Sequence, residues 1–102
     1  MTNTQNIRNT IAQLMREKQD FEPALKKAKE QYSLAYEKVL AWEEAYTASG
    51  EDERIGQKLD KVYDEYSEAD KAMREAKVKV QSIKEALEAL YKAVEAIDWL
   101  GL

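Results

Sequence analysis

The stretch YTASGEDERI, residues 46–55, holds the residues that can end one helix and begin another. Gly50 can adopt the left-handed backbone conformation that often follows the end of a helix. Ser49 or Asp52 can then cap a second helix, and acidic residues beside them stabilise the positive end of its dipole. The stretch therefore predicts a turn at about 49–52 that connects two helices.

On both sides of this turn, apolar residues recur at alternating steps of four and three, the spacing of a coiled-coil seam. Of the 25 seam positions 24 are apolar, whereas a hydrophobic content of 44% predicts about 11 by chance. The spacing predicts two long helices, at about 4–48 and about 53–98. The first seam consists of Ile7, Ile11, Leu14, Lys18, Phe21, Leu25, Ala28, Tyr32, Ala35, Val39, Trp42 and Tyr46. The second consists of Ile55, Leu59, Val62, Tyr66, Ala69, Met73, Ala76, Val80, Ile83, Leu87, Leu90, Val94 and Ile97.

Folding the chain near Gly50 aligns the two seams so that large side chains face small ones, as interdigitated packing requires. The alignment places Tyr46 against Ile55 and brings Lys38 near Glu65. The predicted fold class is all-α, an antiparallel two-helix coiled-coil hairpin. Further contacts predicted in this way are Lys29 with Asp70, Glu22 with Lys77, and Tyr36 with Tyr63.

Pro23 is the one proline in the chain, and it lies within the first predicted helix. Inside a helix it removes a backbone hydrogen bond and crowds the preceding turn. The seam spacing nevertheless continues through it, so we expect the first helix to be kinked or broken near Pro23. Lys18, the one polar seam residue, lies just before this point and is interpreted as a side chain that reaches past the kink to solvent.

A chain of 102 residues has room for one small domain, 1–102, and not for a large core around a buried active site. Three glycines and one proline favour helices over a turn-rich β fold. The absence of Cys and His removes the commonest thiol nucleophile, general base and metal ligands. The segment GEDERIGQK lacks the lysine of a phosphate-binding loop. We therefore expect no enzymatic activity, no catalytic residue, no cofactor and no metal ion.

The net charge of -4, from 16 basic and 20 acidic residues, argues against direct binding of nucleic acid through a basic face. No stretch approaches the roughly 18 apolar residues of a membrane span. The segment MTNTQNIRNT lacks the basic and apolar regions of a signal peptide. The expected protein is soluble and cytoplasmic, or alternatively exported without a cleaved signal peptide.

Apolar residues exceed the needs of one seam at the open end of the hairpin, where the two chain ends meet. Such a surface would be buried by a protein partner or by a second copy, which would give a dimer or a larger helical bundle. The sequence thus predicts a non-enzymatic coiled-coil module that binds proteins through helix–helix contacts at its open end. The predicted contact residues are Met15, Tyr91, Trp99, Leu100 and Leu102.

Acidic residues gather at the other end of the hairpin, around the turn. They are either solvated residues of a connector, which is the interpretation we favour, or a working acidic tip. The residues concerned are Glu43, Glu44, Glu51, Asp52 and Glu53.

A helical hairpin of about 100 residues with a tryptophan near its bend resembles the WXG100 class of small exported proteins. In that class a Trp-x-Gly motif forms the bend, whereas here Trp42 lies on the seam eight residues before Gly50. The class carries an export signal near its C-terminus, a tyrosine followed four residues later by an acid, and Tyr91 and Glu95 match this spacing. The resemblance implies an exported or secretion-associated protein.

The turn is also similar to the hairpins of transcript-cleavage factors, whose acidic tip enters a channel of RNA polymerase. Glu51, Asp52 and Glu53 would be the matching acids. This likeness implies an acidic-tip inhibitor or regulator of a nucleic-acid enzyme, which a phage could encode.

Overall fold

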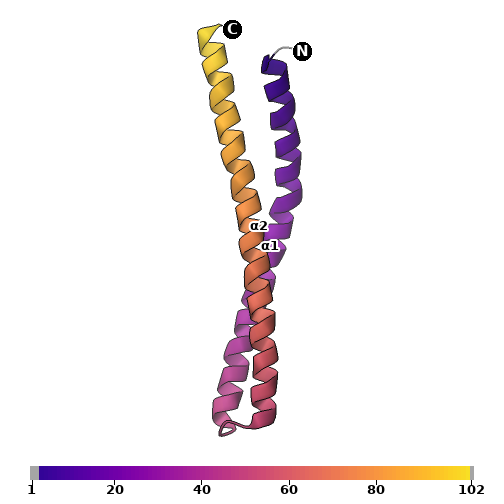
Figure 1. Ribbon diagram of the computed structural model, residues 1–102, viewed down its shortest axis with the longest axis vertical. Helices are drawn as coiled ribbons and strands as arrows, with labels where there is room; N and C mark the ends of the chain where they lie inside the picture. The colour runs from indigo at the N-terminus through magenta and orange to yellow at the C-terminus, as the bar shows by residue number, and fades with distance from the viewer. Residues whose placement is uncertain (1–2, 102) are drawn as a thin grey trace.

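The computed structural model describes residues 3–101, which form two helices, α1 (Asn3–Ala48) and α2 (Glu53–Leu100). The chain reverses at 49–52, so that the first and last parts of the chain lie at the same end of a rod (Figure 1). The rod measures 74 × 19 × 14 Å. The described residues contain no strand. The predictions of an all-α class and of a helical hairpin are confirmed.

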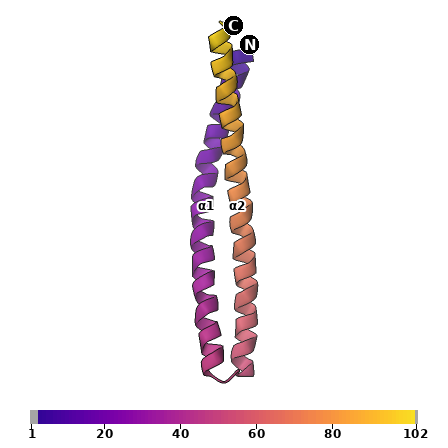
Figure 2. The same cartoon turned by 90° about the vertical axis from the view of Figure 1, so that its left-hand side faces the viewer.

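The contact between the helices is a continuous strip rather than a globular core. In Figure 2 the helices lie side by side over most of the rod, and they cross in the view of Figure 1. All 25 predicted seam positions are buried or half-buried, so the seam is confirmed. Val80 is the most enclosed of them, with 3% of its surface exposed. The buried residues are Ala35, Val39, Leu59, Val62, Val80, Ile83 and Leu87.

Polar contacts across the strip show which residues of α1 lie beside which residues of α2. Lys38 Nζ lies 3.1 Å from Glu65 Oε2, so this predicted contact is confirmed. One turn further from the chain reversal, the hydroxyl oxygens of Tyr32 and Tyr66 are 2.8 Å apart and share a hydrogen bond. The helices are therefore joined at mid-rod by an ion pair and by a tyrosine pair.

The predicted ion partners of Asp70 and Glu22 on the opposite helix are wrong. Asp70 Oδ2 lies 3.0 Å from Arg74 Nε, and Glu22 Oε1 lies 3.5 Å from Lys18 Nζ. Both pairs join residues four apart on one helix, which are neighbours on the helix surface and need no reach across the seam. Lys18 is thus a half-buried seam residue whose charge is paired on its own helix.

The helix α1 continues through Pro23 without interruption. The alternative of a break near this residue is therefore wrong, because backbone hydrogen bonding on either side and the seam beneath keep the segment helical. Pro23 has no amide hydrogen to donate to the carbonyl of Gln19. Its ring lies on the exposed side of α1. The kink stays a prediction.

The turn is held by side chains that cap both helices. Asp52 is the N-cap of α2, and its Oδ1 accepts from the backbone N–H groups of Arg54 at 2.8 Å and Ile55 at 3.3 Å. Ser49 Oγ donates to the carbonyl of Tyr46 and accepts from the N–H of Asp52. Of the two residues predicted as caps, Asp52 therefore caps α2 and Ser49 links the two helices.

Two consecutive residues of the turn have left-handed backbone conformations. Gly50 has φ = 73°, as predicted, and Glu51 has φ = 65°. Glycine tolerates this region without cost, whereas a residue with a Cβ is strained there by about 1–2 kcal/mol. The turn consequently stores strain at Glu51.

Replacing Glu51 with glycine should raise the free energy of unfolding by about 0.5–1 kcal/mol, because relief of strain exceeds the added entropy of the unfolded chain. Urea denaturation followed by circular dichroism measures the change. Glu53→Gly is the control and should destabilise, since Glu53 lies in the first turn of α2. Equal effects of the two changes would contradict the assignment of strain to Glu51.

Candidate protein-binding surfaces

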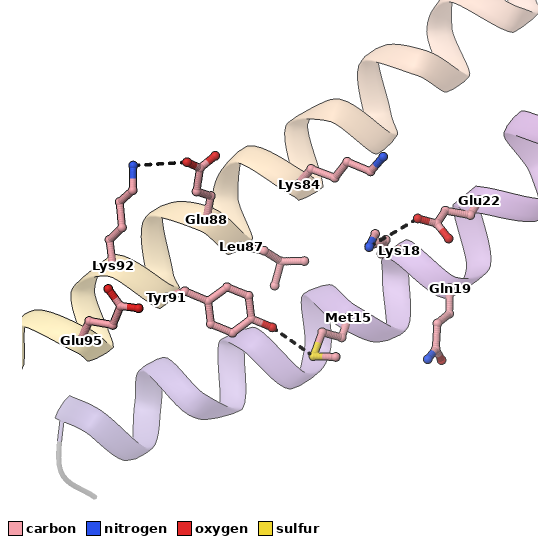
Figure 3. Close-up of a pocket in the computed structure, with 10 residues that line it drawn as sticks. All are labelled: Met15, Lys18, Gln19, Glu22, Lys84, Leu87, Glu88, Tyr91, Lys92 and Glu95. Carbon is pink, nitrogen blue, oxygen red and sulfur yellow. Dashed lines mark hydrogen bonds and ion pairs between the residues drawn. The ribbon is translucent and has the colours of Figure 1, made fainter. Parts of the chain in front are cut away.

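Met15 and Tyr91 meet at the open end, as part of the predicted contact surface. The hydroxyl of Tyr91 donates to Met15 Sδ at 3.5 Å, and this contact joins α1 to α2 (Figure 3). Each side chain keeps almost half of its surface exposed. Since both lie beside the seam, they widen the apolar strip on one side of the rod. The pair offers an apolar spot that two helices hold in place.

An open groove surrounds this pair, with charged residues along its rims (Figure 3). Leu87 is buried at its base. Two ion pairs lie within single helices, Lys18 with Glu22 at 3.5 Å and Lys92 with Glu88 at 3.2 Å. The rims carry equal numbers of positive and negative side chains, so apolar contacts would contribute more than net charge to binding here. The charged lining residues are Lys18, Glu22, Lys84, Glu88, Lys92 and Glu95.

Trp99 and Leu100 form a second exposed apolar spot at the end of α2. Trp99 is 85% exposed and Leu100 is 61% exposed. Trp99 comes eight residues after Tyr91, which places it about 12 Å further along the axis. The open end thus presents two apolar spots, Met15 with Tyr91 and Trp99 with Leu100. Leu102 lies outside the described residues.

Three of the five acids predicted at the tip have structural roles. Glu43 Oε1 accepts from the hydroxyl of Tyr63 at 2.6 Å, Asp52 caps α2, and Glu53 lies in its first turn. Glu44 and Glu51 are exposed. The hydrogen bond to Glu43, together with burial and nearby negative charge, raises the pKa of Tyr63 above its ordinary value. The tip is therefore in part a structural device.

A cluster of tyrosines lies at mid-rod. The rings of Tyr32 and Tyr66 are 5.3 Å apart and those of Tyr36 and Tyr66 are 6.1 Å apart. The predicted contact of Tyr36 with Tyr63 is wrong, since Tyr36 lies against Tyr66 and Tyr63 reaches Glu43. The hydrogen bond with Tyr32, together with burial and neighbouring charge, raises the pKa of Tyr66 to about 12.

We expect one tyrosine to titrate near pH 12 instead of near its ordinary value of 10.0. Because the folded state holds this proton more tightly than the unfolded state, the contribution to stability is complete below pH 10.0 and is lost as the pH rises to about 12. Ultraviolet absorbance of the phenolate measures the titration. Tyr32→Phe removes the hydrogen bond and should return Tyr66 toward its ordinary pKa, with Tyr91→Phe as the control. An unchanged titration in Tyr32→Phe would contradict the assigned cause.

A third apolar surface, which the sequence analysis missed, lies at mid-rod on the side of the Lys38–Glu65 ion pair. Leu34 borders it and is 63% exposed. Its signal in the sequence is a second set of apolar residues at steps of three, four or seven, outside the main seam. This set consists of Leu34, Ala41, Ala45 and Ala48.

The grooves found along residues 3–101 are open to solvent. Within the same residues, no group of three or more acidic side chains is placed to hold a metal ion, and neither helix has a segment long and apolar enough to cross a membrane. The surfaces are of the kind that another helix can cover. The chain matches no protein-family model, no curated protein and no solved structure.

Proposed function

We propose that this protein is a non-enzymatic coiled-coil module that binds another protein, or a second copy of itself, through helix–helix contacts at its open end. The observation that carries the proposal is the exposure of Trp99, at 85% of its surface. A tryptophan gains more from burial at an interface than most residues, because its large ring is apolar and its N–H can find a partner. On this proposal α1 and α2 pack as an antiparallel coiled coil, and the module works in the cytoplasm without contacting nucleic acid.

The two apolar spots of the open end suit a helical partner. A helix in the groove beside Met15 and Tyr91 would cover the exposed half of each side chain. The same helix, extended by about two turns, would reach the level of Trp99. The equal charges on the groove rims would set the orientation of the partner more than its affinity. Anchoring by aromatic side chains inside a polar rim is typical of protein interfaces.

Removal of residues 98–102 should lower binding of the partner, or association of two copies through their open ends, by about tenfold or more while leaving helicity nearly unchanged. Capture on immobilised full-length protein, followed by mass spectrometry, identifies the partner, and titration of that partner measures the loss. Val78→Ser is the control, since Val78 is 65% exposed but lies at mid-rod. If the truncated chain binds as well as the full chain, the contact lies elsewhere.

An alternative is a WXG100-like exported or secretion-associated protein. It is favoured by the positions of Tyr91 and Glu95, which line the same groove one helical turn apart (Figure 3). Both remain accessible to a secretion receptor. Co-expression with the genes that neighbour its own gene, followed by detection of the protein outside the cell, tests this function. Export that persists after Tyr91→Ala and Glu95→Ala would remove the role of these residues.

A regulator of a nucleic-acid enzyme that acts through the acidic tip is the other alternative. The exposed carboxylates of Glu44, Glu51 and Glu53 are the groups that could enter a basic channel. Changing Glu51 and Glu53 to glutamine keeps the cap at Asp52, so folding should be retained. We expect binding to be retained as well, with dipole effects of at most about 1 kcal/mol. A variant that folds but loses its cellular effect would favour the regulator.

A further inference from the structure

The mid-rod groove on the Lys38 side is the most promising surface outside the open end. It lies between α1 and α2, and the ion pair of Lys38 with Glu65 spans it. Leu34 stands at its border with 63% of its surface exposed. Small side chains next to a large exposed one are what an interdigitating helix needs. The small residues that line the groove are Ala35, Ala41, Ala69 and Ala72.

Charged residues of α2 follow this side of the rod in a definite order. Steps of three, four and three residues place Lys58, Lys61, Glu65 and Glu68 on one face of the helix. Two positive charges are thus followed by two negative ones. When a second α2 lies alongside in the opposite direction, Lys58 faces Glu68 of the second copy, and Lys61 faces Glu65 of the second copy. Each pair occurs twice, so the surface is complementary in charge to itself.

The two-fold axis that relates the two α2 helices is also compatible with the residues of α1. The centre of the charge pattern on α2 lies at the level of Tyr63. The contacts of Lys38 with Glu65 and of Tyr46 with Gly56 place this level between Val39 and Leu40 on α1. Around this point, a second α1 running in the opposite direction places its Ala45 opposite Leu34, so that a large side chain meets a small one. One two-fold axis thus fits the charges of α2 and the apolar residues of α1.

We infer that a second copy of this chain docks on the mid-rod groove, with its rod pointing in the opposite direction. The resulting dimer is a four-helix assembly held by Leu34 on either side of the axis and by charge pairs between the α2 helices. Its two open ends point away from each other, so Met15, Tyr91 and Trp99 stay free in both copies. The dimer therefore uses a surface separate from the proposed open-end binding site, and either surface can fail its test without the other.

The mass in solution tests the apolar part of the interface. The chain should sediment at twice its mass of 11.8 kDa over a concentration series. Leu34→Glu should raise the dimer dissociation constant by about 100-fold or more, because two apolar contacts are lost per dimer. Val78→Glu is the matched control, since Val78 is equally exposed at 65% but lies away from the groove. A monomeric native chain, or equal effects of the two changes, would overturn the inference.

Charge-reversal variants test whether these charged residues pair across the interface. The chain with both changes separates a loss of pairing from an effect on folding. Glu68→Lys alone places two lysines opposite each other, and Lys58→Glu alone places two glutamates opposite each other, so each should weaken the dimer about tenfold or more. The chain with both changes restores opposite charges across the interface and should dimerise nearly as well as the native chain. If the double change weakens the dimer further than either single change, these residues do not face each other.

The direction of the two rods is tested by a distance. The native chain has no cysteine, so Val78→Cys introduces one site for a spin label. In the inferred dimer the two labels lie about 45 Å apart along the rods, because residue 78 is 15 residues from the axis in each copy. Rods that point the same way would bring the labels to the same level. A short distance in electron paramagnetic resonance would therefore overturn the inferred arrangement, and a distance near that expected would support it.

Discussion

Replacing Val80 with aspartate is expected to unfold the hairpin. Val80 is 3% exposed in the strip between α1 and α2, so a carboxylate at this position would lose most of its contact with water although Lys29, Lys77 and Lys84 line the groove beside it. Burying an ion costs several kcal/mol even when a cation is near, which is comparable with the whole stability of many small domains. The change also removes an apolar side chain from the seam. Far-ultraviolet circular dichroism at neutral pH should show most of the helical signal lost.

The control for this change lies two residues away on the same helix. Val78 is 65% exposed, so Val78→Asp should keep the helical signal and alter the free energy of unfolding by only about 0.5 kcal/mol. Acidification should restore part of the structure of Val80→Asp, since the neutral carboxyl group is less costly to bury. If both variants remained equally folded, the strip would not be what holds the helices together.

Replacing Pro23 with alanine is expected to raise the free energy of unfolding by about 2–3 kcal/mol, because proline is about 3 kcal/mol less favourable than alanine inside a helix. The change restores a donor for the carbonyl of Gln19 and removes the clash of the ring with the preceding turn. Part of the gain is offset by the greater freedom of the unfolded chain. Urea denaturation measures the free energy, and the exposed position of Pro23 ensures that no core contact is lost.

A second exposed position of α1 serves as the comparison. Ser33→Ala changes helix propensity alone and should stabilise by at most about 0.5 kcal/mol. If Pro23→Ala stabilised no more than Ser33→Ala, the structure would accommodate the proline without loss. In that event a kink at this position would be a feature on which the seam depends.

The seam could be predicted from the sequence because a two-helix rod buries one strip only. Every buried residue then follows a single sequence periodicity, because no second layer of structure buries residues outside the seam. Even Lys18 is half-buried as its place in the period requires, since its charge is paired with Glu22. The ion pair of Lys38 with Glu65 was predicted for the same reason, because aligning the seams also sets the residues beside them.

Features that depend on choices between near neighbours could not be predicted. Asp70 has possible cationic partners on both helices, and the spacing alone does not favour the one on its own helix. The left-handed conformation of Glu51 arises from the closure of the turn, and a glutamate in the sequence does not indicate it. Gly56 is similar: a Cβ there would lie 3.1 Å from Tyr46 Cε2, so its small size makes room for the ring. The sequence showed only a glycine within a helix.

The mid-rod groove was missed because its residues are individually ordinary. Alanines at helical spacing are common, and an exposed leucine such as Leu34 has no meaning by itself. The groove is recognised only when the second helix supplies Ala69 and Ala72 opposite. The open end could be predicted as a surface, but its division into two apolar spots could not, since that depends on where Tyr91 meets Met15.

The single reversal of the chain also determines the order in which contacts between α1 and α2 form. The residues that meet are 27 apart in sequence at Lys38 with Glu65 but 76 apart at Met15 with Tyr91. Because loop entropy grows with this separation, we expect contacts near the turn to form first and those at the open end to form last and separate most often. A partner bound at the open end would hold α1 and α2 together in the part of the rod where they separate most readily. Its binding should therefore slow amide hydrogen exchange in residues 85–100 far more than near the turn.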